Sequence, residues 1–300
     1  MNQQTLKKEY TFEGRGLHTG KFAHLTLCPA PENFGIKFVR TDLDVIIPAL
    51  ADRVSRTDRS TTITEGDVSV VTIEHVLSAL TGLGVDNALV KIDNEEMPIL
   101  DGSAEYYTRA IAADGLQQQN AERIYLEIPE PIELKDEQTG SWVKIEPSDR
   151  PSYEVTVDFN SRVLGVQTAQ WSEGDDYAGE LACCRTFCFF HELEFLASKG
   201  LVKGGDVDNA IVIVEHPVTK EQIDNMCQLF NQPKLSVTDH GYLSNLKLHF
   251  PNECGRHKLL DLIGDMRLIG GFPKARITAF KPGHKINSSL AKIVLNNKKY

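Results

Sequence analysis

The sequence lacks long apolar runs and any regular cysteine pattern. Its longest apolar stretches, such as Ala210–Val214, are far shorter than the roughly 18 residues that a membrane-spanning helix requires. The first ten residues are polar and contain no apolar signal core. Six cysteines without a C-x-x-C pair are too few for a disulfide framework in 300 residues, and a metal cluster of Cys183, Cys184 and Cys188 is disfavoured because zinc-type spacing is missing. We therefore expect a cytoplasmic protein with reduced thiols.

An excess of positive charge is also absent, because 32 lysines and arginines are outnumbered by 42 aspartates and glutamates. The net charge of −10 gives no long-range attraction to phosphate backbones, which disfavours nucleic acid as the principal ligand. The glycines at positions 14, 16 and 20 fit neither a P-loop nor a dinucleotide-binding pattern. With 41% apolar and 25% charged residues, the composition predicts an ordinary globular protein with a substantial core.

Up to about residue 92 the sequence alternates short β-rich runs with turn signals, which is typical of a sheet. Two helices interrupt this pattern. The first spans Thr72–Leu83, where apolar residues recur at helical spacing and Thr72 is a candidate N-cap; the second spans about residues 103–115. The polar segment Gln117–Arg123 then separates this half from a new strand at Ile124–Ile128, and we interpret it as a domain boundary.

The second half repeats this order of strands and helices, without a residue-level internal repeat. Because the length also favours two domains, the sequence predicts an α+β fold with an N-terminal domain at 1–120 and a C-terminal domain at 124–300. The predicted strands are Trp142–Ile145, Tyr153–Phe159, Ala210–Val214 and Arg276–Phe280, and the predicted helices are His191–Lys199, Thr219–Phe230 and Gly255–Ile269.

One face of the last predicted helix carries three groups that suit metal chemistry. His257, Asp261 and Asp265 fall within an arc of about 80°, with apolar residues on the opposite side. An imidazole and a carboxylate one turn apart can both bind a single zinc ion, and the second carboxylate could orient a neighbouring group. A solvated polar face with i,i+4 pairing explains the same spacing and, on spacing alone, is the more frequent case.

Two further histidines are candidates for the same chemistry. Glu74 and His75 lie in the first turn of an otherwise apolar helix. A His₂Asp set completed by His75 would leave a fourth position open, as in catalytic zinc sites, with Glu74 beside it as a general base. The ordinary alternative is a glutamate favoured by the helix dipole next to a partly buried histidine. His284 follows a strand and a turn, so we expect it in a loop.

Six motifs occur along the chain in a fixed order. They are Gly16-Leu17-His18-Thr19-Gly20, Thr72-Ile73-Glu74-His75, Met97-Pro98-Ile99-Leu100-Asp101-Gly102-Ser103, Arg185-Thr186-Phe187, His257-Lys258-Leu259-Leu260-Asp261-x-x-Gly264-Asp265 and Lys281-x-Gly283-His284. Because it contains these motifs in this order, the chain closely resembles the UDP-3-O-acyl-N-acetylglucosamine deacetylases, which are zinc enzymes of the committed step of lipid A synthesis. The resemblance covers about residues 5 to 295, and the ordered set is far more specific than any one motif.

The resemblance implies a fold and a metal site. The fold has two similar α+β domains, each a β-sheet with a helical layer, with the helical layers facing each other and the active site at the domain junction. Zinc is implied to be held by His75, His257 and Asp261, which come from both domains. Iron(II) would fit the same ligands.

The resemblance also implies roles for the residues around the metal. Glu74 is the implied general base, and His284, oriented by Asp265, is the protonated partner of the leaving amine. Thr186 is implied to help hold the oxyanion, and Lys258 to supply positive charge nearby. Whether Glu74 alone or Glu74 with His284 handles both proton transfers stays open.

For the substrate, the resemblance implies that Phe187 lines the sugar site and that Phe159 contacts the nucleotide. An insert within 191–213 is implied to form an apolar tunnel for the acyl chain. The stretch 217–250 is longer than in the commoner pattern, and in some relatives a second enzyme is fused beyond the position of Tyr300. The candidate tunnel walls are Leu193, Phe195, Leu196, Leu201 and Val202.

The implied activity is zinc-dependent hydrolysis of the 2-acetamido group of UDP-3-O-acyl-N-acetylglucosamine, with release of acetate. One alternative is another zinc amidohydrolase that acts on a peptide or small amide, which the match outside the metal site disfavours. A second is a non-catalytic lipid- or nucleotide-binding protein on the same scaffold. Such a protein would not need Glu74, His284 and Asp265 together, and the sequence contains all three.

Overall fold

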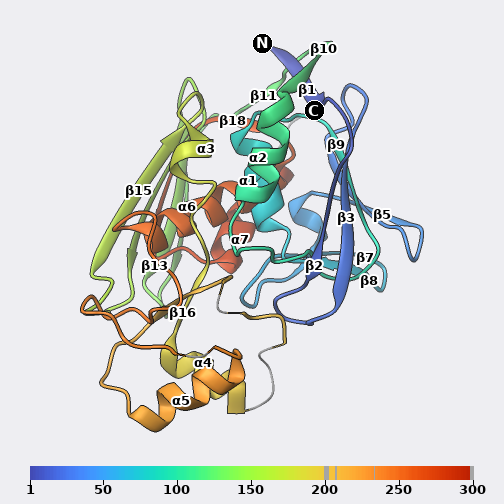
Figure 1. Cartoon of the computed structure of the whole chain (residues 1–300). Coiled ribbons are helices and arrows are strands. Elements are labelled where there is room, and N and C mark those ends of the chain that lie inside the picture. Colours follow the sequence, from blue (N-terminus) through green and yellow to red (C-terminus); the bar gives the residue numbers. More distant parts are fainter. Residues whose placement is uncertain (199–202, 207, 233, 298–300) are drawn as a thin grey trace.

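Two large β-sheets enclose a layer of helices (Figure 1). The computed structural model describes residues 1–198, 203–206, 208–232 and 234–297, and the side chains of residues 196–198 are outside this description. The helices between the sheets are α1 (Glu74–Gly82), α2 (Glu105–Asp114), α6 (Glu253–Met266) and α7 (His284–Asn296).

The two large sheets share one topology. Their strand orders are β2-β3-β9-β4-β5 and β12-β13-β18-β14-β15. In each sheet two hairpins flank a central strand, which is antiparallel to one hairpin and parallel to the other. The recurring order of elements predicted from the sequence thus appears as a common sheet topology. The strands are β2 (Tyr10–Arg15), β3 (Phe22–Pro29), β9 (Ala88–Ile92), β4 (Ile36–Arg40), β5 (Val45–Pro48), β12 (Ile132–Asp136), β13 (Ser141–Pro147), β18 (Phe272–Phe280), β14 (Ser152–Asp158) and β15 (Val166–Ser172).

Shorter strands and helices complete the fold. A three-stranded sheet precedes α1, a two-stranded sheet joins the chain start to the middle, and β11 runs parallel to β18. The helices α4 and α5 lie at the lower end of the view in Figure 1, below β16. The remaining elements are β1 (Asn2–Leu6), β6 (Val54–Arg56), β7 (Thr62–Glu65), β8 (Val68–Val71), β10 (Leu116–Glu122), β11 (Tyr125–Glu127), β16 (Phe187–Phe189), β17 (Ile211–Ile213), α3 (Tyr177–Glu180), α4 (Phe190–Ser198), α5 (Lys220–Leu229), η1 (Ala51–Arg53) and η2 (Arg267–Ile269).

Alternation of side chains gives each large sheet one buried face. In β14, Tyr153, Val155 and Val157 are buried while the residues between them are not. The strand packs against α6, so its apolar face meets the apolar side of that helix. Residues of both large sheets and of the helices between them belong to one continuous apolar core.

Helices α1 and α6 pack closely against each other at the centre of the molecule. A glycine makes this approach feasible, because a Cβ at Gly264 would lie 2.1 Å from the backbone oxygen of Glu74. Any larger side chain would push the two helices apart. The start of α1 is therefore held against the middle of α6, and these two segments carry most of the candidate site.

The start of α1 differs from the sequence prediction. Thr72 is not an N-cap: it has a left-handed backbone (φ 61°), and its hydroxyl donates to the buried carboxylate of Glu96. Ile73 occupies the N-cap position and makes no side-chain cap. The prediction was wrong because a partner distant in sequence competes for the hydroxyl.

The polar segment 117–123, which we interpreted as a domain boundary, contains a strand that the sequence did not indicate. Residues 116–122 form β10, which pairs antiparallel with β1 at the start of the chain. The segment contains almost no apolar residues, so it carries no alternation that would indicate a strand, and its pairing partner is distant in sequence.

The α+β fold class is confirmed, with sheets and helices present in both halves of the chain. Within the described residues, the helices are all too short or too polar to cross a bilayer. The division into domains at 1–120 and 124–300 stays a prediction.

Candidate functional site

Helix α1 begins with the two residues that the sequence singled out. Glu74 and His75 form its first turn, and both side chains are buried. The backbone N–H of Thr61 donates to Glu74 at 3.0 Å, which fixes one carboxylate oxygen. Burial raises the pKa of Glu74 to about 7, the charges of Asp265 and Asp261 act in the same direction, and His284 opposes them. Glu74 is thus tuned to exchange a proton near neutral pH.

The polar face of α6 is buried and faces α1. His257, Asp261 and Asp265 are 1%, 3% and 0% exposed, which excludes the solvated face that spacing alone had favoured. His257 Nδ1 lies 3.0 Å from the backbone oxygen of Cys184, so this nitrogen carries the proton of a neutral ring and the other nitrogen is left as a lone-pair donor.

Three side chains from the two helices converge on one point. The Nε2 atoms of His75 and His257 lie 3.7 Å and 3.5 Å from Oδ1 of Asp261. Burial lowers the pKa of both histidines, that of His75 to about 3, so both rings are neutral at pH 7. Burial alone would raise the pKa of Asp261, but Lys258 and the neighbouring histidines hold it well below its usual range. Two neutral imidazoles and a carboxylate are the protonation states that metal binding requires.

This group fits a metal ion. Its candidate ligand atoms all lie within 4.8 Å of one another, and among the described residues no other group of three or more His, Cys, Asp or Glu side chains has this geometry. Oδ1 of Asp261 is buried and has no hydrogen-bond partner, whereas Oδ2 accepts from Lys258 at 2.8 Å. A buried carboxylate oxygen without a partner is costly, and a cation bound there would remove that cost.

His284 approaches the same site from a third helix. It is the first residue of α7, so the expectation that it lies in a loop is wrong. Its Nδ1 lies 2.9 Å from Asp265, and its Nε2 lies 3.8 Å from Oε1 of Glu74. Burial would lower the pKa of His284, but the carboxylates of Asp265 and Glu74 outweigh burial and raise it to about 9. His284 is therefore a buried cation at neutral pH.

Two residues that sequence reasoning missed support this arrangement. The hydroxyl of Thr61 donates to Oδ1 of Asp265 at 2.5 Å, and the amide of Asn287 donates to Oδ2 at 2.9 Å. Asn287 lies one turn after His284 on α7, so a helix prediction at 284–296 would have found it. Thr61 lies in the loop before β7 and carries no local signal.

A cavity of about 270 Å³ lies next to the metal-binding group. Thr186, Phe187 and Leu193 line it together with Lys258, whose ammonium lies 5.6 Å from the centre of the Phe187 ring. Phe159 packs edge-on against Phe187 with ring centres 5.5 Å apart.

Of the remaining predicted tunnel residues, only Phe195 has a described side chain. Phe195 is 59% exposed and is not among the residues that line the cavity. Leu201 and Val202 lie outside the described residues, as does the side chain of Leu196.

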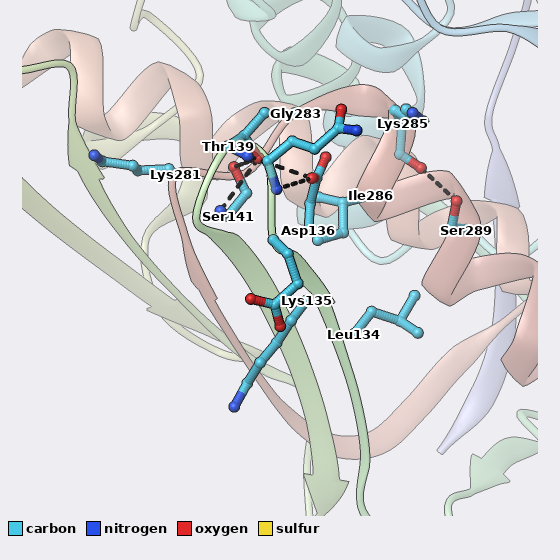
Figure 2. A pocket seen from close by; sticks show the side chains of 12 residues that line it. Leu134, Lys135, Asp136, Thr139, Ser141, Lys281, Gly283, Lys285, Ile286 and Ser289 are labelled. Atoms are coloured by element: carbon cyan, nitrogen blue, oxygen red, sulfur yellow. Dashed lines mark hydrogen bonds between the residues drawn. The ribbon is translucent and has the colours of Figure 1, made fainter.

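A second hollow, of about 580 Å³, is lined by Gly283 and residues around it (Figure 2). The β12–β13 turn and the start of α7 form its walls. The lining contains three lysines and two acidic residues, and Leu134 and Ile286 supply apolar surface. The charged residues are Lys135, Lys281, Lys285, Asp136 and Glu137. The ammonium of Lys281 lies 3.7 Å from Asp158, the residue before Phe159.

The two similar sheets and the buried His₂Asp group, with a carboxylate and an imidazolium beside it, define a metal-binding α+β protein with groups suited to hydrolysis. The family LpxC, UDP-3-O-acyl N-acetylglycosamine deacetylase, matches residues 3–226 and 231–296. The chain belongs to this family, which confirms the resemblance seen in the sequence.

Individual relatives agree with this assignment. The UDP-3-O-acyl-N-acetylglucosamine deacetylases of an Anaeromyxobacter species and of Trichormus variabilis are 39% and 37% identical to the chain; each match covers 98% of this chain, and it covers 88% and 99% of the relative. The bifunctional enzyme LpxC/FabZ of Porphyromonas gingivalis is 42% identical over 97% of this chain. The chain spans 64% of the length of that bifunctional relative.

Proposed function

We propose that the chain catalyses hydrolysis of the 2-acetamido group of UDP-3-O-acyl-N-acetylglucosamine, releasing acetate, in lipid A biosynthesis. The observation that carries this proposal is the position of Glu74 and His284 beside the group formed by His75, His257 and Asp261. A base near neutrality and a buried cation, 3.8 Å apart, lie next to a set of candidate metal ligands. Hydrolysis of an unactivated amide needs these three functions together.

His75, His257 and Asp261 would hold Zn²⁺, and Fe²⁺ would fit the same donors. When bound, such an ion supplies a Lewis acid that polarises a carbonyl and makes water more acidic. Lys258, hydrogen-bonded to the far oxygen of Asp261, keeps that carboxylate ionised and oriented.

Glu74 is the proposed general base. With one oxygen held by the Thr61 N–H, its other oxygen is left to accept a proton from the attacking water. A carboxylate with a pKa of about 7 is a far better proton acceptor than an ordinary glutamate, and about half of it is ionised at neutral pH.

His284 is the proposed general acid. An amine anion is too poor a leaving group to depart, so the nitrogen must receive a proton as the C–N bond breaks. His284 is protonated at neutral pH, and Asp265 fixes its ring by accepting from Nδ1, which directs the Nε2 proton towards Glu74 and the reaction centre. The Thr186 hydroxyl and the Lys258 ammonium are the proposed stabilisers of the oxyanion.

The acylated sugar and the nucleotide of the substrate would occupy the two cavities. The cavity lined by Phe187 and Leu193 would take the sugar and the start of the acyl chain. The hollow with Lys281 and Lys285 would take the nucleotide, next to Phe159. In this proposal residues 1–120 and 124–300 act as two domains that share the site between them. A second enzyme activity fused to the chain is proposed from the bifunctional relatives.

We propose the cytoplasm as the location of the reaction, and the six free thiols fit such a reducing compartment.

The test is deacetylation by the purified, metal-loaded chain, followed as release of free amine. UDP-3-O-acyl-N-acetylglucosamine with a long acyl chain should be hydrolysed, and the same compound with a 3-O-acetyl group should show a kcat/KM lower by at least about 100-fold, because several buried methylenes are lost. Equal values for both compounds would favour a generic amidohydrolase. Tight binding of the long-chain compound without turnover would favour a non-catalytic binding protein.

A further inference from the structure

The long segment after β17 extends the small sheet next to the cavity. Strands β16 and β17 run parallel, and residues 242 and 243 add a third, antiparallel edge through a bridge between Ile213 and Tyr242. The backbone N–H of Leu243 donates to the oxygen of Val212 at 2.9 Å, and that of Val214 donates to Gly241 at 2.8 Å. The segment is thus anchored to the sheet by backbone hydrogen bonds.

The two faces of this small sheet contact different parts of the protein. Ile211, Ile213 and Tyr242 share one apolar cluster with Cys254 of α6, so this face points to the main body. Because side chains alternate along a strand, Val212 points to the other face, where it shares a second cluster with Leu243. Helices α4 and α5 cover that second face.

Helix α5 is fixed on this face by several contacts. A capping box formed by Thr219 and Gln222 defines its start, and the Gln222 side chain also donates to Glu194 of α4 at 2.8 Å. Met226 is buried in the second cluster, and the thiol of Cys227 accepts from the N–H of Leu235 at 3.3 Å. The helix ends at Leu229, with Phe230 as its C-cap residue.

Phe230 and Leu243 from this segment line the same cavity as Thr186 and Lys258. One polar lining residue, Lys258, donates to the candidate metal ligand Asp261 at 2.8 Å. The apolar lining residues Leu193, Val212, Phe230 and Leu243 all belong to, or pack against, the second cluster. The cavity therefore connects the candidate reaction site with an apolar wall to which the segment 217–245 contributes Phe230 and Leu243.

We propose that Phe230 and Leu243 set the length of the acyl chain that the enzyme accepts. This inference rests on the proposed function. An acyl chain attached to a sugar at the reaction site would enter the cavity and extend towards the second cluster, where the Phe230 ring limits its length. Residues 217–245 are thus a specificity element, and their role is to close the apolar wall that α4 and β17 leave incomplete.

The test compares acyl chain lengths in the wild-type protein and in Phe230→Ala. A series of UDP-3-O-acyl-N-acetylglucosamines with increasing even-numbered chains is assayed for kcat/KM. In Phe230→Ala the ratio of kcat/KM for a chain two carbons beyond the wild-type optimum to that for the optimum should rise by about tenfold, since two more methylenes find space. Val212→Phe, which adds volume to the same wall, should shift the optimum to shorter chains.

Ile223→Ala is the matched control, because Ile223 lies on α5 and packs against the second cluster without lining the cavity. It should leave the chain-length profile unchanged. An unchanged profile in Phe230→Ala would overturn the inference while leaving the proposed deacetylase activity standing. If Phe230→Ala does not fold, Leu243→Phe decides, because it adds volume at the second proposed residue and should shift the optimum to shorter chains.

A second measurement separates this inference from the proposed function. Free fatty acids of graded length are used as probes, and the shift in Tm that each produces is measured. Phe230→Ala should extend the range of lengths that stabilise the protein, whether or not it turns over any substrate. Absence of deacetylation by the wild-type protein would reject the proposed function, and identical fatty-acid profiles for wild type and Phe230→Ala would reject the length-setting role.

Discussion

Nδ1 of His284 lies 2.9 Å from the carboxylate of Asp265, and this pair determines how the site should respond to alkaline pH. Burial opposes the charged imidazole, but Asp265, followed by Glu74, raises the pKa of His284 to about 9. A general acid must be protonated and a general base ionised, so kcat/KM should be highest between the pKa of Glu74, about 7, and that of His284 and should fall as the pH rises through the latter. The measurement is kcat/KM of the wild-type protein as a function of pH, and the decrease at high pH is called the alkaline limb below.

Removing the charge of Asp265 should move the limb. In Asp265→Asn, His284 loses its nearest anion, its pKa falls, and the alkaline limb should shift down by about one unit or more. Asp93→Asn is the control, because Asp93 forms an exposed pair at 2.7 Å with His24, which is not one of the site residues. If kcat/KM still decreases near pH 9 in Asp265→Asn, then the group whose deprotonation causes this decrease is not His284.

The three candidate ligands should each be needed for metal. We expect about one equivalent of divalent metal in the wild-type protein and a large loss in His75→Ala, His257→Ala and Asp261→Ala, because a site with three protein ligands cannot hold the ion well with two. Metal content is measured by elemental analysis after dialysis. Full stoichiometry in all three variants would exclude this site.

Glu74 should separate metal binding from turnover. Its carboxylate accepts from the Thr61 N–H and lies beside the ligands without belonging to the group that they form. We expect Glu74→Gln and Glu74→Ala to retain metal and to lower kcat by about 10²- to 10⁴-fold, the usual range for a lost general base. The glutamine variant preserves size, so it distinguishes lost charge from lost packing. A near-normal kcat in either variant would remove Glu74 from the mechanism.

Close packing of α1 on α6 should be sensitive to one methyl group. In Gly264→Ala the new Cβ would lie 2.1 Å from the Glu74 oxygen, so the helices must separate. We expect a loss of about 1–3 kcal/mol in the free energy of unfolding together with weaker metal binding, because His75 and His257 move apart. Gly14→Ala, whose Cβ would meet no atom closer than 3.4 Å, is the control. Equal Tm and metal affinity in both variants would contradict this account of the packing.

Helical periodicity was the most informative signal for the site. It placed His257, Asp261 and Asp265 on one face of a helix, and the structure has them there. Spacing could not show whether that face is buried, because burial depends on α1, which is distant in sequence. The residue types suggested His75 as a third ligand, but only the resemblance to a family linked it to this face, since no local pattern joins two segments so far apart.

Other features escaped the sequence for identifiable reasons. The strand β10 is rich in glutamine, so its composition did not indicate a strand. Its pairing partner is at the start of the chain, so the flanking sequence did not indicate it either. Helix α7 did carry a signal, because Ile286, Leu290 and Val294 recur every four residues, and overlooking it placed His284 in a loop. The support that Thr61 gives to Asp265 depends on tertiary contact alone.

The split origin of the metal-binding group has a consequence for the folding of the chain. His75 belongs to α1, and His257 and Asp261 belong to α6, which is far along the sequence. An ion held by all three would act as a removable cross-link that closes a very long loop, comparable in topology to a disulfide but set by the concentration of free metal rather than by redox state. Chelation should therefore lower Tm as well as activity, and the metal supply of the cell would govern how long the folded chain persists.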